Sequence, residues 1–108
     1  MWRAIAVASA VWIIAAGGAR AQDEGDARRG QAFAQKVCAV CHALRKGQVE
    51  SPHPDAPTFP VIAQVPGLTA LALTVSLQGA HRAMPDLVLD TQERQDVIAF
   101  ILSLRPAN

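Results

Sequence analysis

The chain has 108 residues, of which 51% are hydrophobic and 18% are charged, and its formal net charge at pH 7 is +1. A chain of this length forms one small domain. Its nearly balanced charge gives no electrostatic reason to expect binding to nucleic acid or to an anionic membrane surface, so neither partner is expected.

Residues 1–21 have the pattern of a cleavable secretory signal peptide. Arg3 supplies a basic start, Ala4 to Ala16 form the apolar stretch, and Ala19-Arg20-Ala21 matches a small-x-small cleavage site. The apolar stretch is shorter than the roughly 20 residues that cross a bilayer, which argues against the alternative of an uncleaved membrane anchor. We therefore expect cleavage after Ala21 and a periplasmic domain formed by residues 22–108, with no membrane span.

The first predicted helix covers residues 26–40. Small and apolar residues recur along one stripe at helical spacing, and acidic residues lie at the N-terminal end, where the helix dipole favours negative charge. The stripe consists of Ala27, Gly30, Phe33, Ala34 and Val37, and the acidic residues are Asp23, Glu24 and Asp26.

A long surface loop is predicted over Arg45–Pro57, because glycine, serine and several prolines break every periodicity there. Structureless connections of about 12 to 15 residues are uncommon in compact domains and are often functional, so we expect this loop to wrap around something. Thr58 then has the position of an N-cap for a short helix that continues to about Gln64, with Pro60 in its first turn.

Two more helices complete an all-α pattern. The third is predicted over Leu68–Gln78 and is ended by Gly79. Its apolar residues are Leu68, Leu71 and Val75 on one side, with Leu73 and Leu77 extending that surface. The last helix begins with a capping pair, Asp90 and Glu93, and ends before Pro106. Its apolar face consists of Val97, Ile98, Ile101 and Leu104.

The segment with the clearest chemistry is Cys38-Ala39-Val40-Cys41-His42, a C-x-x-C-H run at the end of the first helix. This run is the attachment signature of c-type haem. Cysteines three residues apart lie on one helical face, where their sulfurs can add to two vinyl groups along one edge of a porphyrin. The adjacent histidine can then bind iron from one side.

Three other interpretations of the two cysteines are less favoured. A thioredoxin-like dithiol is normally found beside a βαβ pattern, which is not visible here. A zinc site needs about four ligands, and beyond the motif only scattered candidates such as His53 and His81 remain. A disulfide across two intervening residues would close a very small loop and remove little entropy from the unfolded chain.

Met84 is the predicted second iron ligand, because it is the only methionine after the signal segment. It lies in a short predicted loop between two helices, and Pro85 restricts it to an extended conformation. A methionine that fills a gap in the core is the alternative role, and His81 is the alternative ligand. We expect His53, which lies between two prolines, to be exposed to solvent.

The chain resembles a class I monohaem c-type cytochrome of the small bacterial type. The matching residues are Cys38, Cys41, His42, Pro57 before Thr58-Phe59, Met84-Pro85, and the closing run from Asp96 to Leu104. The resemblance implies about four helices wrapped around one covalently attached haem c, with the N- and C-terminal helices crossing. It also implies a small residue against an aromatic one at that crossing, which Gly30 and Phe100 fit. Family members often bind a haem propionate through Trp or Tyr. Neither occurs after residue 21, so Arg45, His81 and Arg82 are the candidate substitutes.

We therefore expect an electron-transfer protein rather than an enzyme, with Cys38 and Cys41 bonded to haem and with His42 and Met84 as the ligands of its iron. Its partners, by resemblance, are a dehydrogenase or quinol-oxidising donor and an oxidase or reductase acceptor. The alternative is a haem enzyme or gas-binding protein with an open sixth position. Arg45, Lys46 and Arg82, all near an expected iron ligand, are candidates for a positive docking rim, although they can equally be ordinary solvated charges.

Overall fold

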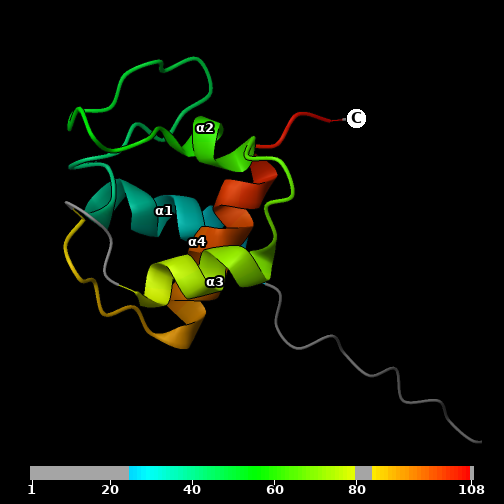
Figure 1. Cartoon of the computed structure of the whole chain (residues 1–108). Helices are drawn as coiled ribbons and strands as arrows, with labels where there is room; N and C mark the ends of the chain where they lie inside the picture. Colours follow the sequence, from blue (N-terminus) through cyan, green and yellow to red (C-terminus); the bar gives the residue numbers. More distant parts are fainter. Residues whose placement is uncertain (1–24, 80–83, 108) are drawn as a thin grey trace, which may run out of the picture.

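The computed structural model describes residues 25–79 and 84–107. They form four helices, α1 (Ala27–Val37), α2 (Phe59–Ala63), α3 (Ala70–Gln78) and α4 (Thr91–Ser103), joined by loops (Figure 1). The regular secondary structure of these residues is helical, which confirms the predicted all-α class. The predicted signal peptide lies outside the described residues, as do Asp23, Glu24, His81 and Arg82.

The crossing of α1 and α4 is the main helix–helix contact of the described residues and confirms the expected crossing of the first and last helices. Gly30 on α1 makes this close approach possible. A Cβ atom at Gly30 would lie 1.9 Å from the carbonyl oxygen of Asp96 and 2.9 Å from the nitrogen of Val97. The atoms nearest to Gly30 are thus backbone atoms of α4. Phe100 is buried one turn farther along α4, where its ring meets that of Phe59.

A buried carboxylate joins the same two helices through hydrogen bonds. The Asp96 Oδ1 atom accepts from the backbone N–H of Asp26 at 2.7 Å and from Gln92 Nε2 at 2.9 Å. The Arg29 guanidinium donates through Nε to Oδ2 at 2.9 Å and through Nη2 to Oδ1 at 3.2 Å. These donors hold the pKa of Asp96 down, from an ordinary 3.8 to about 2, with the Arg29 hydrogen bonds as the largest cause, although burial opposes the shift. Asp96 therefore fixes the start of α1 on α4.

Each helix begins at a side-chain cap, which explains why the predicted starts are nearly correct. Asp26, Thr58 and Thr69 accept hydrogen bonds from the backbone three residues ahead, at Arg29, Val61 and Ala72. Asp90 and Glu93 form the complete reciprocal capping box that their spacing predicts. The ends of α1 and the start of α3 differ from the prediction by one to three residues, since α1 stops at Val37 and α3 begins at Ala70.

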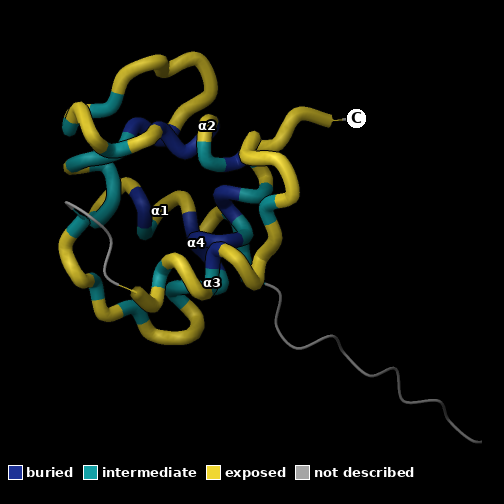
Figure 2. The backbone as a smooth tube through the Cα atoms, in the orientation of Figure 1, coloured by how far each residue is buried: buried dark blue, intermediate teal, exposed yellow. Residues whose placement is uncertain are grey.

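The buried core lies where α2, α3 and the two crossing helices meet (Figure 2). Its members are Ala34, Leu44, Phe59, Ala63, Leu73, Val97, Ile98, Phe100 and Ile101. The predicted apolar face of α4 is confirmed, because Val97, Ile98 and Ile101 are buried and Leu104 packs against the core.

The side assigned to α3 is wrong in part. Leu73 is buried, and Leu68 and Leu77 pack against the core, whereas Leu71 is 72% exposed and Val75 is 62% exposed. Apolar residues lie on all sides of this helix, between a few polar ones, so periodicity in its sequence does not identify the face that packs. None of the helices in the described ranges has the length and apolar character needed to cross a membrane.

Candidate functional site

The C-x-x-C-H motif occupies one tight turn at the end of α1. The backbone N–H of Cys38 caps the helix by donating to Ala34. The N–H groups of Cys41 and His42 then both donate to the carbonyl of Cys38, at 3.1 and 2.9 Å. The chain therefore continues for one more helical turn, which places the two cysteines and the histidine together. Both cysteines are half-buried, and no disulfide joins them.

Neither thiol chemistry nor a zinc cluster is favoured by this turn. Burial raises the pKa of the Cys38 thiol to about 11, which disfavours the reactive thiolate form at this position. In residues 25–79 and 84–107, no group of three or more His, Cys, Asp or Glu side chains is arranged to hold a metal ion. The turn instead offers two cysteine sulfurs and one imidazole, which is what thioether attachment of a porphyrin and iron ligation require.

One ring nitrogen of His42 forms a hydrogen bond within the protein. Its Nδ1 atom lies 2.7 Å from the backbone carbonyl oxygen of Pro57. Because a carbonyl only accepts hydrogen bonds, Nδ1 carries the proton, so in the neutral imidazole Nε2 is the nitrogen with the free lone pair. The ring also packs against Phe59, with 5.3 Å between ring centroids. This arrangement selects the tautomer that binds a metal through Nε2, and it fits an axial iron ligand.

The loop over residues 45–57 folds back onto the motif, which accounts for its unusual length. The Ala43 N–H donates to Ser51 Oγ at 3.0 Å, and the His53 N–H donates to the Cys41 carbonyl at 3.1 Å. The Phe59 N–H donates to the Ala43 carbonyl at 2.9 Å. These contacts hold the loop so that the Pro57 carbonyl lies beside the ring of His42.

His53 differs from its predicted state. It is half-buried rather than freely exposed, and its Nδ1 atom accepts a hydrogen bond from the Asp55 N–H at 3.2 Å. The flanking prolines suggested a solvent-facing residue, but the folded loop returns to the motif at this position. Ser51 was not singled out from the sequence either, because nothing in its immediate neighbours indicates a partner eight residues earlier.

Met84 comes from a separate segment. It is half-buried and begins the non-helical stretch that leads to α4. The far end of the stretch is held by the capping box and by Arg94, whose Nη2 atom donates to the Leu89 carbonyl at 3.1 Å. Among the described contacts, no hydrogen bond or ring contact joins Met84 to the motif.

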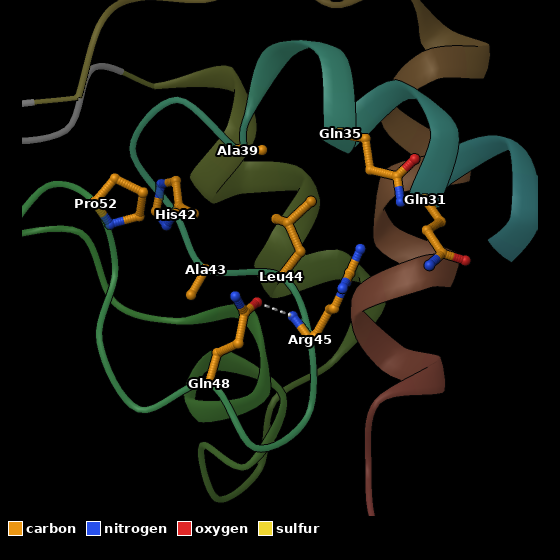
Figure 3. A pocket seen from close by; sticks show the side chains of 9 residues that line it. All are labelled: Gln31, Gln35, Ala39, His42, Ala43, Leu44, Arg45, Gln48 and Pro52. Carbon is orange, nitrogen blue, oxygen red and sulfur yellow. Dashed lines mark hydrogen bonds between the residues drawn. The ribbon is translucent and has the colours of Figure 1, made fainter.

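A hollow of about 460 Å³ lies beside His42, between α1 and the loop (Figure 3). Its lining residues are Gln31, Gln35, Ala39, His42, Ala43, Leu44, Arg45, Gln48 and Pro52. Polar side chains form much of its wall, and Gln48 accepts a hydrogen bond from the backbone N–H of Arg45 at 3.0 Å. Neither cysteine lines this hollow, so we do not assign a porphyrin to it.

Comparisons with known proteins agree with this chemistry. Residues 25–101 match the family described as "Cytochrome C oxidase, cbb3-type, subunit III". The chain is also 36% identical over 81 residues to cytochrome c-552 of Bradyrhizobium diazoefficiens, a match that covers 75% of this chain and 77% of that protein. No solved structure matches the chain. The chain therefore belongs to this cytochrome c family and is a small monohaem c-type cytochrome, with one covalently bound haem c and its iron as the cofactor.

Proposed function

We propose that this electron carrier works in the periplasm, with its haem bonded to Cys38 and Cys41 and its iron bound by His42 and Met84. The bound haem supplies one-electron chemistry by gaining and losing an electron at iron. The protein's own residues would attach the ring, orient the imidazole and supply two ligands to the iron.

The observation that carries this proposal is the hydrogen bond from His42 Nδ1 to the Pro57 carbonyl. It holds the ring orientation and leaves Nε2 as the donor atom. A hydrogen bond from the far nitrogen of a ligating histidine also makes the coordinating nitrogen more basic. The histidine follows directly on Cys41, so attachment of the ring and binding of its iron would depend on the same turn.

Met84 is proposed as the second iron ligand because its thioether is a soft donor in a restrained segment. It is half-buried, Pro85 limits its backbone, and the capping box and Arg94 secure the other end of the stretch. A methionine opposite histidine raises the reduction potential and closes iron to small molecules. Closing that position is what distinguishes a carrier from a peroxidase-like or gas-binding protein.

The proposed location and partners follow from other features. The pattern of residues 1–21 supports export and cleavage after Ala21, leaving residues 22–108 as the mature domain. The proposed donor is a dehydrogenase or a quinol-oxidising protein, and the proposed acceptor is an oxidase or a reductase. The description of the matched family as an oxidase subunit supports an oxidase as the acceptor.

Haem attachment to named cysteines tests the centre of this proposal. The full chain is expressed with working haem-attachment machinery, and the periplasmic and membrane fractions are each separated by denaturing electrophoresis and stained for haem. We expect a stained band for the wild type and a weak, poorly matured product for Cys38→Ser or Cys41→Ser. A colourless wild-type band would contradict covalent attachment, and a stained band confined to the membrane fraction would contradict the periplasmic location.

A further inference from the structure

We propose that Ser51 is a positioning residue for His42, which acts by holding the peptide groups on either side of Ala43 so that the Pro57 carbonyl stays on the imidazole. This inference deepens the proposed function and rests on the role of His42 as an iron ligand. Ser51 itself contacts neither the ring of His42 nor the sulfur of either cysteine through any described hydrogen bond.

Ala43 directly follows His42 and is buried. Its N–H donates to Ser51 Oγ at 3.0 Å, and its carbonyl accepts from the Phe59 N–H at 2.9 Å. The two contacts hold Ala43 to Ser51 in the middle of the loop and to Phe59 just beyond its end. Pro57 and the N-cap Thr58 directly precede Phe59.

The two partners of the His42 hydrogen bond lie far apart along the chain. His42 and Pro57 are fifteen residues apart, and their bond is 2.7 Å long. A loop of this length without internal helix or strand does not hold a carbonyl on a ring by local conformation alone. The contacts at Ala43 add restraint to the backbone bond from the His53 N–H to the Cys41 carbonyl. Together these bonds anchor the loop on both sides of the segment that ends at Pro57.

The Ser51 hydroxyl oxygen is the hydrogen-bond acceptor of the Ala43 N–H. Since the Ala43 residue is buried, loss of the Ser51 oxygen would leave its N–H without an acceptor, which costs more than the loss of an exposed hydrogen bond. The local structure would open more often, and the His42–Pro57 bond would open with it. A weaker hydrogen bond at Nδ1 makes Nε2 a weaker ligand of the iron. The weaker ligand favours ferrous iron and raises the reduction potential.

The sharpest comparison is between Ser51→Thr and Ser51→Val in the complete haem-bearing protein. The two side chains have nearly the same shape and are both branched at Cβ, but only threonine keeps the hydroxyl acceptor. Ser76→Ala serves as the control, because Ser76 is exposed on α3. Hydrogen exchange of the Ala43 N–H and of the His42 Nδ1 proton is followed by NMR in the reduced state, together with the reduction potential.

We expect Ser51→Val to exchange both protons about five- to tenfold faster than wild type, as the loss of one hydrogen bond implies. Exchange of the buried amides of Ile98 and Ile101 should stay unchanged, and the potential should rise. Ser51→Thr and Ser76→Ala should match wild type. If Ser51→Val matched Ser51→Thr in ring-proton exchange and potential, the positioning role would be wrong.

Wild-type exchange provides a test that does not depend on a folded variant. The Ala43 and Phe59 amides and the His42 ring proton should respond to denaturant together, as members of one local opening. An unprotected Ala43 amide beside a protected His42 ring proton would overturn the inference. Failure of the proposed function looks different, because a protein with covalent haem whose His42 is not bound to iron would contradict the ligand assignment whatever the Ser51 variants do.

Discussion

At the scale of single residues, the tautomer of His42 is decided by a backbone carbonyl rather than by another side chain. Pro57 has no N–H of its own to donate, but its carbonyl is free to accept and lies 2.7 Å from Nδ1. Substitution of Pro57 therefore does not remove this partner, whereas displacement of the loop does. The imidazole chemistry thus depends on where a loop returns, which is a property of the fold.

Met84→Ala tests the second ligand and separates a carrier from an enzyme. We expect the ferric variant to lose the sulfur-to-iron charge-transfer band and the reduced variant to bind carbon monoxide. Its potential should fall, because a soft ligand that favours ferrous iron is lost, and some peroxidase activity should appear. Absorbance spectroscopy and redox titration measure these changes.

His81→Ala is the matched control for the Met84 variant, since His81 is the alternative ligand in the same part of the sequence. It should keep the charge-transfer band and stay closed to carbon monoxide. A wild-type protein that binds carbon monoxide rapidly at neutral pH would favour the gas-binding or peroxidase-like alternative. A Met84 variant with an unchanged spectrum would refute the ligand assignment.

At the scale of helices, the contact between α1 and α4 leaves no room for a side chain at Gly30. Glycine to alanine at an ordinary interior helix position stabilises a protein by about 0.5–1 kcal/mol. At Gly30 the added Cβ would lie 1.9 Å from a backbone oxygen, so the helices must move apart. We expect Gly30→Ala to lower the free energy of unfolding by about 1–3 kcal/mol, measured by urea denaturation of the haem protein.

Gln31→Ala is the control for that measurement, because Gln31 is the next residue of α1 and is exposed. It should change the free energy of unfolding by no more than about 0.5 kcal/mol. Equal effects of the two substitutions would show that the close approach at Gly30 does not contribute to stability.

The hydrogen bonds of Asp96 make the contact between α1 and α4 sensitive to acid. Since the folded-state pKa is depressed from 3.8 to about 2, ionised Asp96 stabilises the fold above the unfolded pKa, and this contribution is lost as the pH falls through the folded pKa. Asp96→Asn should therefore be less stable than wild type at neutral pH. The difference should shrink between about pH 4 and about pH 2, as followed by urea denaturation across that range.

Asp86→Asn is a suitable control for the acid experiment, because Asp86 is exposed in the stretch before α4. Its free energy of unfolding should follow that of wild type at every pH. A constant gap between wild type and Asp96→Asn down to pH 2 would mean that the carboxylate does not stabilise the fold through its charge.

At the scale of the whole molecule, the core is small and depends on a few aliphatic residues with two phenylalanines. Domains only slightly smaller than this one rarely gain more than about 3–5 kcal/mol from one apolar core. We expect the chain without attached haem to be largely unfolded, because a group that binds only the native state stabilises it by linkage. Circular dichroism of that chain should show little helix, and a cooperative, native-like melt would contradict this expectation.

Positive charges on the surface beside His42 are expected to affect the rate of electron transfer with partner proteins. Arg45 and Lys46 are exposed there, while Arg82 of the predicted rim lies outside the described residues. Combined Arg45→Glu and Lys46→Glu should slow electron transfer with an acidic partner several-fold and flatten its dependence on salt. Arg28→Glu, an exposed change near the start of α1, is the control. Rates with an unchanged salt dependence would mean that these charges are merely solvated.

Much of the local structure could be predicted because its causes lie within four residues of each other. The caps at Thr58 and at Asp90 with Glu93 mark helix starts through hydrogen bonds to the next turn, and the structure has them. The C-x-x-C-H run likewise specifies a cofactor by spacing alone, and the family comparison confirms that cofactor. The signal peptide and Met84 remain predictions, since each depends on processing or on a ligand contact.

The sequence by itself determined the helical class, the caps at Thr58 and Asp90 and the covalent haem, whereas the tertiary structure decided which distant groups meet. The bond between His42 and Pro57 spans fifteen residues, and those between Asp96 and Arg29 span sixty-seven. No periodicity encodes such contacts, because they depend on how the loop returns and how closely α1 approaches α4. Leu71 and Val75 show the same limit, because an α3 with apolar residues on all sides takes its buried side from its neighbours alone.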